Sequence, residues 1–119
     1  MNTKKDTTLA RSTIGGLVGI GRRSGGIRIG VRGSVDSIHR NQCRLLIIAR
    51  NASPRTTKIL RRAAGDIPII LVESEVILGS WLGMHNVAAV SVVNNNLASG
   101  ILKKHRSLHN DETTHPTNT

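Results

Sequence analysis

The side chains that carry out enzymatic chemistry are few in this sequence, and they form no catalytic pattern. The carboxylates Asp66, Glu73 and Glu75 lie on predicted loops or helix caps, with no second carboxylate placed near a buried base. The single cysteine, Cys43, is not spaced with any histidine as metal ligands are, and we interpret it as a packed thiol. We therefore expect no catalytic residue, no metal, no cofactor and no enzymatic activity.

A glycine-rich stretch, GGLVGIGRRSGG at residues 15–26, invites comparison with loops that bind phosphate. The dinucleotide-binding spacing requires a glycine where Ser24 stands, the Gly-Lys-Ser/Thr ending of a P-loop is absent, and no strand is predicted before the stretch. We interpret these glycines instead as allowing a helix over Leu9–Arg23 to pack closely against a neighbour or to fray.

Basic side chains are the chemistry that the sequence carries in quantity. Lys and Arg number 17 against 7 Asp and Glu, which gives a net charge of +10 and a pI near 11.5. Residues 1–62 hold 14 basic and 2 acidic side chains, whereas residues 63–119 hold 3 and 5. This segregation indicates a polyanionic partner, of which a phosphate backbone is the usual kind. Charge that only maintains solubility, or attraction to anionic lipid, is the alternative.

The apolar residues are almost all aliphatic, which favours an α/β protein over one built on aromatic clusters. With one Trp and no Phe or Tyr, the chain cannot build the stacking platforms of single-strand binders, which favours a reader of shape, phosphates and base edges. Trp81 itself is expected in the core, at helical spacing from Ile77. No apolar run reaches the roughly 20 residues of a membrane span, and no secretory leader is visible, so we expect a cytoplasmic protein.

Apolar periodicity, caps and breakers predict an alternation of helices and strands. The predicted helices cover Leu9–Arg23, Arg32–Asn41, a stretch from Pro54 to about Gly65, Ser74–Leu82, and a stretch that starts at Asn94–Asn96. The predicted strands cover Ile27–Ile29, Arg44–Ala49, Ile67–Val72 and Val87–Val93. This order predicts a three-layer α/β/α sandwich around a mixed sheet of about four strands. We expect a mobile basic N-terminus over residues 1–8, one domain over 9–103 and a disordered tail over 104–119.

Three places combine into a candidate site. The first is the turn Gly30–Gly33 with the helix start after it, where free N–H groups and the helix dipole favour phosphate. The second is a set of exposed basic residues on and after that helix: Arg40, Arg44, Arg50 and Arg55. The third is the loop Gly83–Val87, where Met84 and Val87 are placed to press against an unstacked base. Taken alone, that loop is better interpreted as an ordinary entry into a strand.

From about Leu9 to Leu102, the order of these segments resembles the ribosomal L-seven-Ae/L-thirty-e superfamily of RNA-binding proteins, including its small bacterial members. The stretch GIRIGVRGSVDSIHRNQCRLLIIARNASP follows the family's turn, helix, strand and A-x-[DN]-A-x-P pattern. The stretch IPIILVESEVILGSWLGMHNVAAVSVV is similar to its V-P-x-x-x-V-x-S-x-x-x-L-G-x-x-x-G run and closing alanine-rich strand. The resemblance implies an α/β/α fold that grips kink-turns or related bent RNA with the turn and helix after the first strand and the loop before the last.

By position, the resemblance implies that Gly30 is the turn glycine, that Arg32 is a basic reader, and that residues 84–87 meet a protruding nucleotide. The expected RNA-binding residues are Arg28, Gly30, Val31, Arg32, Gly33, Ser34, Asp36, Arg40, Arg44, Arg50, Met84, His85, Asn86 and Val87. Other basic residues are expected to add non-specific phosphate contacts: Lys4, Lys5, Arg11, Arg22, Arg23 and Lys103–Arg106. The expected partners are structured RNA, above all ribosomal RNA, and neighbouring ribosomal proteins, and the free protein is expected to be a monomer.

Two residues depart from the family pattern. Gly33 stands where the family places a Glu or Gln that reads guanine, and Asp36 stands where a Lys faces the phosphates. Two alternatives stay open, and these departures are the best support for the first of them. One is a protein–protein adaptor that kept the fold and lost specific RNA binding, and the other is a small nucleotide-handling enzyme.

Overall fold

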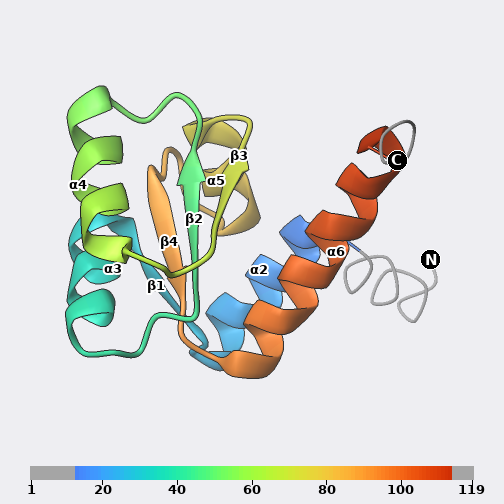
Figure 1. The fold of residues 1–119 in the computed structure, drawn as a ribbon, viewed down its shortest axis with the longest axis horizontal. Coiled ribbons are helices and arrows are strands. Elements are labelled where there is room, and N and C mark those ends of the chain that lie inside the picture. The colour runs from blue at the N-terminus through green and yellow to red at the C-terminus, as the bar shows by residue number, and fades with distance from the viewer. Residues whose placement is uncertain (1–12, 114–119) are drawn as a thin grey trace.

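The computed structural model describes residues 13–113, with side chains up to residue 109. Its centre is a four-stranded sheet in the order β1-β4-β2-β3, formed by β1 (Ile27–Ile29), β2 (Leu45–Ala49), β3 (Ile69–Val72) and β4 (Ala89–Val92) (Figure 1). Strand β4 runs antiparallel to both of its neighbours, while β2 and β3 are parallel. Every residue of β2 is buried, as expected for an aliphatic run that is covered on both faces.

The described part of the chain forms five helices, each of which follows or precedes a strand. They are α2 (Ile14–Ser24), α3 (Gly30–His39), α4 (Pro54–Ala64), α5 (Glu75–Trp81) and α6 (Asn95–Thr113). The hydroxyls of Ser53 and Ser74 accept hydrogen bonds from Thr56 N–H and Ile77 N–H, so both predicted N-caps are confirmed.

The helices cover both faces of the sheet. Helices α3 and α4 lie on one face, over a core that includes Leu46, Ile48 and Leu60. Helices α2, α5 and α6 lie on the other face, over a core that includes Ile47 and Val90 (Figure 1). The predicted three-layer α/β/α sandwich around a mixed sheet is therefore confirmed.

The glycine-rich stretch is a packing surface. A Cβ added to Gly15 would lie 2.6 Å from Cε2 of Trp81, and one added to Gly21 would lie 3.0 Å from Ile27 and closer still to Leu97. These glycines let α2 approach α5 and α6 more closely than alanine would allow. Half-buried Trp81 packs on the core of that face, as predicted.

The helix boundaries differ from the predictions in three places. Helix α2 starts at Ile14, after its N-cap Thr13, whereas the predicted helix begins at Leu9. Helix α3 starts two residues early, at Gly30, and ends two residues early, because Asn41 turns into the left-handed region with a φ of 61°. Helix α6 continues to Thr113, through residues 104–113 of the segment that was predicted as a tail. That segment contains neither Gly nor Pro to stop a helix. The predictions for residues 1–12 and 114–119 lie outside the described residues.

Candidate nucleic-acid interface

The sheet topology brings the predicted turn and loop to one edge. Strands β1 and β2 are both antiparallel to β4, and β3 is parallel to β2, so the helices that follow these three strands all begin at the edge where β4 begins. The register agrees: Ile29 of β1 pairs with Val90, and the N–H of Ala49 donates to the carbonyl of Ala88, 2.9 Å away. We call the surface formed by residues 30–33 and 84–87 the turn-loop edge.

The start of α3 supplies backbone N–H groups to this edge. Gly30 adopts a φ of 91°, which favours glycine, and a Cβ there would meet nothing within 4 Å. The N-cap residue, Ile29, makes no side-chain hydrogen bond to the first turn, whereas Ser53 and Ser74 cap α4 and α5. The exposed Arg32 lies in the same turn. The start of α3 therefore favours the binding of an anion, through its uncapped N–H groups, the positive end of the helix dipole and an arginine.

The loop before β4 is held by carbonyl groups of α5. The N–H of Met84 donates to the carbonyl of Gly79 at 2.9 Å, and the N–H of Val87 donates to the carbonyl of Glu75 at 3.0 Å. Gly83 enters the loop with a φ of 70°. Residues 84–86 are exposed, and the side chain of Met84 is 42% accessible, so an apolar group faces solvent in the loop that leads into β4, the strand whose start pairs with the end of β1.

Three groups support the loop in a role that was not predicted from the sequence; Arg22, one of them, was expected only to contact phosphates. A Cβ on Gly79 would lie 2.8 Å from the carbonyl carbon of His85 and 2.9 Å from the carbonyl oxygen of Met84. The amide oxygen of Asn51 accepts a hydrogen bond from Glu75 N–H at 2.8 Å, and the Arg22 guanidinium donates to the carbonyl of Leu82. Gly79 and Asn51 occupy fixed positions of the two motifs quoted above, and that was the signal by which they could have been found.

Two expected site residues are buried instead. Val87 is 4% exposed and belongs to the core, so it cannot press against a ligand. Ser34 is fully buried where α3 packs on β4. Val31 is half-buried and packs on the core under α3 and α4. All three residues pack within the domain, and the side chains of Val87 and Ser34 are not exposed for the direct contact that was predicted.

Two expected arginines lie away from the turn-loop edge, and a third, beside Gly33, has its guanidinium held by other groups. Helix α3 has ten residues, so Arg40 lies about 15 Å along its axis from Gly30 at 1.5 Å per residue. Arg44 donates its N–H to the carbonyl of Val92, at the opposite edge of the sheet. The guanidinium of Arg28 donates to the carbonyls of Gly25 and Ile27, both at 3.0 Å, and so points away from Gly33. The structure therefore splits the predicted arginine cluster.

Arg50 remains at the same end of the sheet as the turn-loop edge, where its N–H donates to the carbonyl of Val72 at 2.8 Å. Partial burial lowers the pKa of His105 on α6, and the positive charges of His109 and Arg50 lower that pKa further. Arg50 is thus within electrostatic reach of α6.

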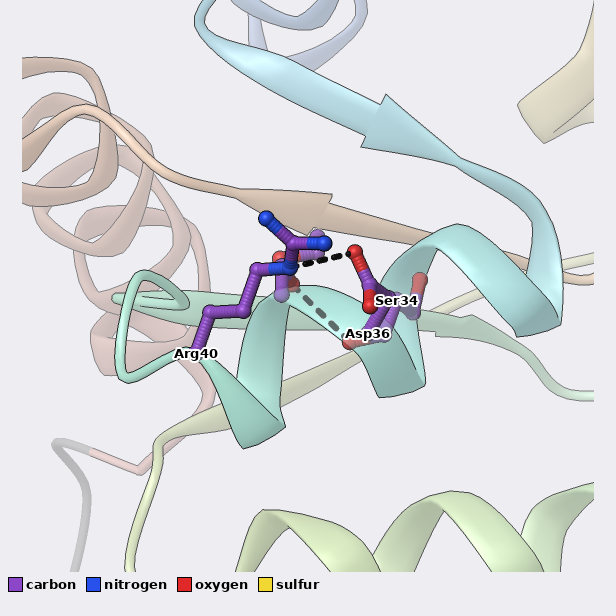
Figure 2. Close-up of polar contacts among 5 residues, drawn as sticks. Ser34, Asp36 and Arg40 are labelled. Atoms are coloured by element: carbon purple, nitrogen blue, oxygen red, sulfur yellow. Dashed lines mark hydrogen bonds and ion pairs between the residues drawn. The ribbon is translucent and has the colours of Figure 1, made fainter.

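Asp36 forms an ion pair on the exposed face of α3. Figure 2 shows Arg40 reaching back along the helix to Asp36, with 3.0 Å between Nε and Oδ2. Both side chains are more than half exposed, and such i,i+4 pairs contribute only about 0.3–0.5 kcal/mol to stability. Arg32, Asp36 and Arg40 follow one another at intervals of four residues, so they share this face.

The opposite face of α3 is joined to the sheet by serines (Figure 2). The hydroxyl of Ser37 donates to the carbonyl of Ser34 at 2.9 Å and lies 2.6 Å from the hydroxyl of Ser91 on β4. The hydroxyl of Ser34 is buried and has no hydrogen-bond partner within the described part of the chain. A buried unpaired hydroxyl costs about 1–3 kcal/mol.

Ser34→Ala is therefore expected to raise the free energy of unfolding by about 1 kcal/mol, measured by urea denaturation. Ser37→Ala is the matched control and is expected to lower the free energy of unfolding by about 1 kcal/mol, because it removes the contact with Ser91. A loss of stability in Ser34→Ala would mean that its hydroxyl is paired in the folded protein.

The chain was then compared with known proteins. The model of the Ribosomal protein L7Ae/L30e/S12e/Gadd45 family matches residues 13–103, which is most of the chain and includes every helix and strand of the sandwich up to the first half of α6. The chain belongs to this family. The predicted resemblance is thereby confirmed. No curated protein is detectably similar to the chain in sequence.

Two solved structures are similar to this chain in fold. A protein of unknown function from Bacillus halodurans C is 22% identical, with a TM-score of 0.74 over 78% of this chain and 96% of that one. The 15.5kD RNA binding protein of Giardia lamblia is also 22% identical, with a TM-score of 0.66 over 91% of this chain and 92% of that one. At this identity, both likenesses establish the fold.

Among the described residues, no group of three or more His, Cys, Asp or Glu side chains is placed to hold a metal ion. No helix in residues 13–113 is long and apolar enough to cross a membrane.

Proposed function

We propose that this protein binds structured RNA at the turn-loop edge, and that the preferred RNA is kinked. The observation that carries the proposal is the convergence of an uncapped helix start, Arg32 and the exposed loop around Met84 on one edge. Membership of the family and a net charge of +10 support it. In this proposal the protein is a cytoplasmic ribosomal or ribosome-associated component rather than an enzyme, monomeric when free, with ribosomal RNA as its partner.

Each part of the edge has a distinct role. Phosphate oxygens accept hydrogen bonds from the first-turn N–H groups of α3 and from the Arg32 guanidinium. Met84 packs against a base that the kink has unstacked, and His85 and Asn86 offer polar groups to its edge. A straight duplex keeps its bases stacked, so it meets the cations but leaves Met84 without a contact.

The test compares a kink-turn RNA with a plain duplex of equal length across a salt series. Arg32→Ala is expected to weaken binding to the kinked RNA by about tenfold, the loss of one charge-assisted contact. Arg44→Ala removes the same charge at the opposite edge of the sheet and is the matched control. It is expected to weaken binding to both RNAs equally and slightly, through the salt-dependent term alone.

The RNA titrations have three informative outcomes. A preference for the kinked RNA that Arg32→Ala abolishes supports the proposal. Equal and steeply salt-dependent binding to both RNAs would leave a charge-driven RNA binder without kink recognition. Binding to neither RNA would overturn the proposal and favour the protein–protein adaptor, for which Asp36 on the exposed face of α3 is the best support.

A further inference from the structure

A groove of about 670 Å³ runs between α3 and α4 on their outer side, away from the sheet. Its apolar wall is formed by Val35 of α3 and by Ile59 and Ala63 of α4. Ile59 is 43% exposed, although it lies one residue from the fully buried Leu60. The site proposed above uses the starts of the helices and leaves this groove unassigned.

The polar lining of the groove is entirely basic. Arg55, Lys58 and Arg62 come from α4 and His39 comes from α3, with no acidic side chain among the lining residues. The three α4 residues are spaced i, i+3 and i+7, so they form one stripe along the helix. Within the described residues the only ion pair is that of Asp36 with Arg40, so this stripe has no carboxylate partner.

Such a stripe lowers the intrinsic stability of helix α4. Like charges at i,i+3 and i,i+4 destabilise a helix, and Arg55 stands in the first turn, where the dipole disfavours a cation. Helix α4 contains four basic residues and no acidic residue in its eleven positions. A helix that served only to cover the core would gain stability from acidic residues on its exposed face. The stripe is therefore more consistent with a bound polyanion.

The shape of the stripe selects the kind of anion. At 1.5 Å per residue, Arg55, Lys58 and Arg62 extend about 10 Å along the axis of α4, a line of charge rather than a pocket for one phosphate. Helix α4 begins at the same end of the sheet as the turn-loop edge, so the line starts beside the proposed RNA site and leads away from it.

We propose that the groove between α3 and α4 binds the sugar-phosphate backbone of a helical stem that flanks the RNA at the turn-loop edge. Phosphates meet Arg55, Lys58 and Arg62, and ribose faces lie against the apolar wall at Ile59. The inference rests on the proposed function, since the stem reaches the groove from the kink. These contacts add affinity and salt dependence to RNA binding rather than sequence specificity.

The experiment uses the full chain and two kink-turn RNAs, one with a long flanking stem and one with that stem cut short at the kink. The wild type is expected to bind the long-stem RNA about tenfold more tightly. The triple variant Arg55→Gln, Lys58→Gln, Arg62→Gln is expected to bind both RNAs equally. For its binding to the long-stem RNA, the slope of log K against log salt concentration is expected to be less negative by about 3. Gln has good helix propensity and keeps α4 intact, which circular dichroism verifies.

A charge-matched control replaces three cations elsewhere: Arg44→Gln, Lys103→Gln and Arg106→Gln, at the opposite edge and on α6. It is expected to keep the tenfold stem-length effect. Arg32→Ala is expected to weaken binding to both RNAs and also keep that effect. If the wild type binds neither RNA, the proposed function fails together with this inference.

If the wild type prefers kinked RNA but ignores stem length, the groove inference alone is overturned. It is also overturned if the triple variant keeps the stem-length effect and instead loses binding to a glutamate-rich amphipathic peptide. That last result would make the occupant of the groove a protein helix.

Discussion

Gly79→Ala is expected to lower the free energy of unfolding by about 2–3 kcal/mol, near the upper end of the cost of overpacking. The added Cβ would meet the carbonyl groups of His85 and Met84, with 2.8 Å to the His85 carbonyl carbon. These are backbone atoms, so no side-chain rotation can relieve the contact. Residues 84–86 must move away from α5, and the 2.9 Å hydrogen bond from Met84 N–H to the Gly79 carbonyl is strained.

The same shift is expected to weaken binding to kinked RNA by more than tenfold, because Met84 leaves its position at the turn-loop edge. Urea denaturation gives the stability, and RNA titration at a temperature where the variant is fully folded gives the affinity. Gly100→Ala is the matched control: it lies in α6, where an added Cβ meets nothing within 4 Å. That variant is expected to gain up to about 1 kcal/mol of stability from helix propensity and to bind RNA normally. Normal RNA binding by folded Gly79→Ala would contradict the role of the loop.

Much of the fold follows from local chemistry that the sequence displays. Ser53 followed by Pro54 starts a helix wherever it occurs in a suitable segment, because the hydroxyl and the fixed φ act within one turn. The run Leu45–Ala49 is aliphatic throughout and can be stable only when both its faces are covered. Such features need no knowledge of distant residues, and the structure agrees with them.

The membership of the site could not be settled in the same way, because it depends on the directions of the strands. Arg40 and Arg44 stand close to the candidate turn in sequence, yet α3 carries the chain to the opposite edge before Arg44. Val87 stands inside an exposed loop in sequence, but its N–H is bound to the carbonyl of Glu75 on α5 and its side chain lies in the core. Which neighbour each strand has is a property of the whole sheet, and no local pattern specifies it.

The importance of Gly79 also depends on tertiary contact. From the sequence alone, a glycine within a seven-residue helix indicates only a loss of helix propensity. Only the close approach of residues 84 and 85 gives it a positive role. The family motif marks the position without supplying that reason.

Asp36→Lys is expected to strengthen binding to kinked RNA by ten- to a hundredfold. Asp36 lies one helical turn beyond Arg32 on the same exposed face of α3, where the proposed site places phosphates. The change removes a repulsive charge and adds an attractive one, which together amount to about 1.4–2.8 kcal/mol of binding free energy. It also releases Arg40 from its 3.0 Å ion pair. The stability of the fold is expected to change by less than about 0.5 kcal/mol, as for other exposed pairs.

Two further variants serve as controls for this prediction. Asp36→Asn removes the repulsion without adding a cation, so its affinity is expected to lie between those of the wild type and Asp36→Lys. Asp66→Lys makes the same change of two charges in the exposed turn before β3, at the opposite edge of the sheet, and should raise affinity for kinked and straight RNA alike. A kink-specific gain confined to position 36 would place the exposed face of α3 against the RNA. If position 36 gains no more than position 66, that face does not meet the RNA, and the Asp36–Arg40 pair is better explained as part of a surface for another protein.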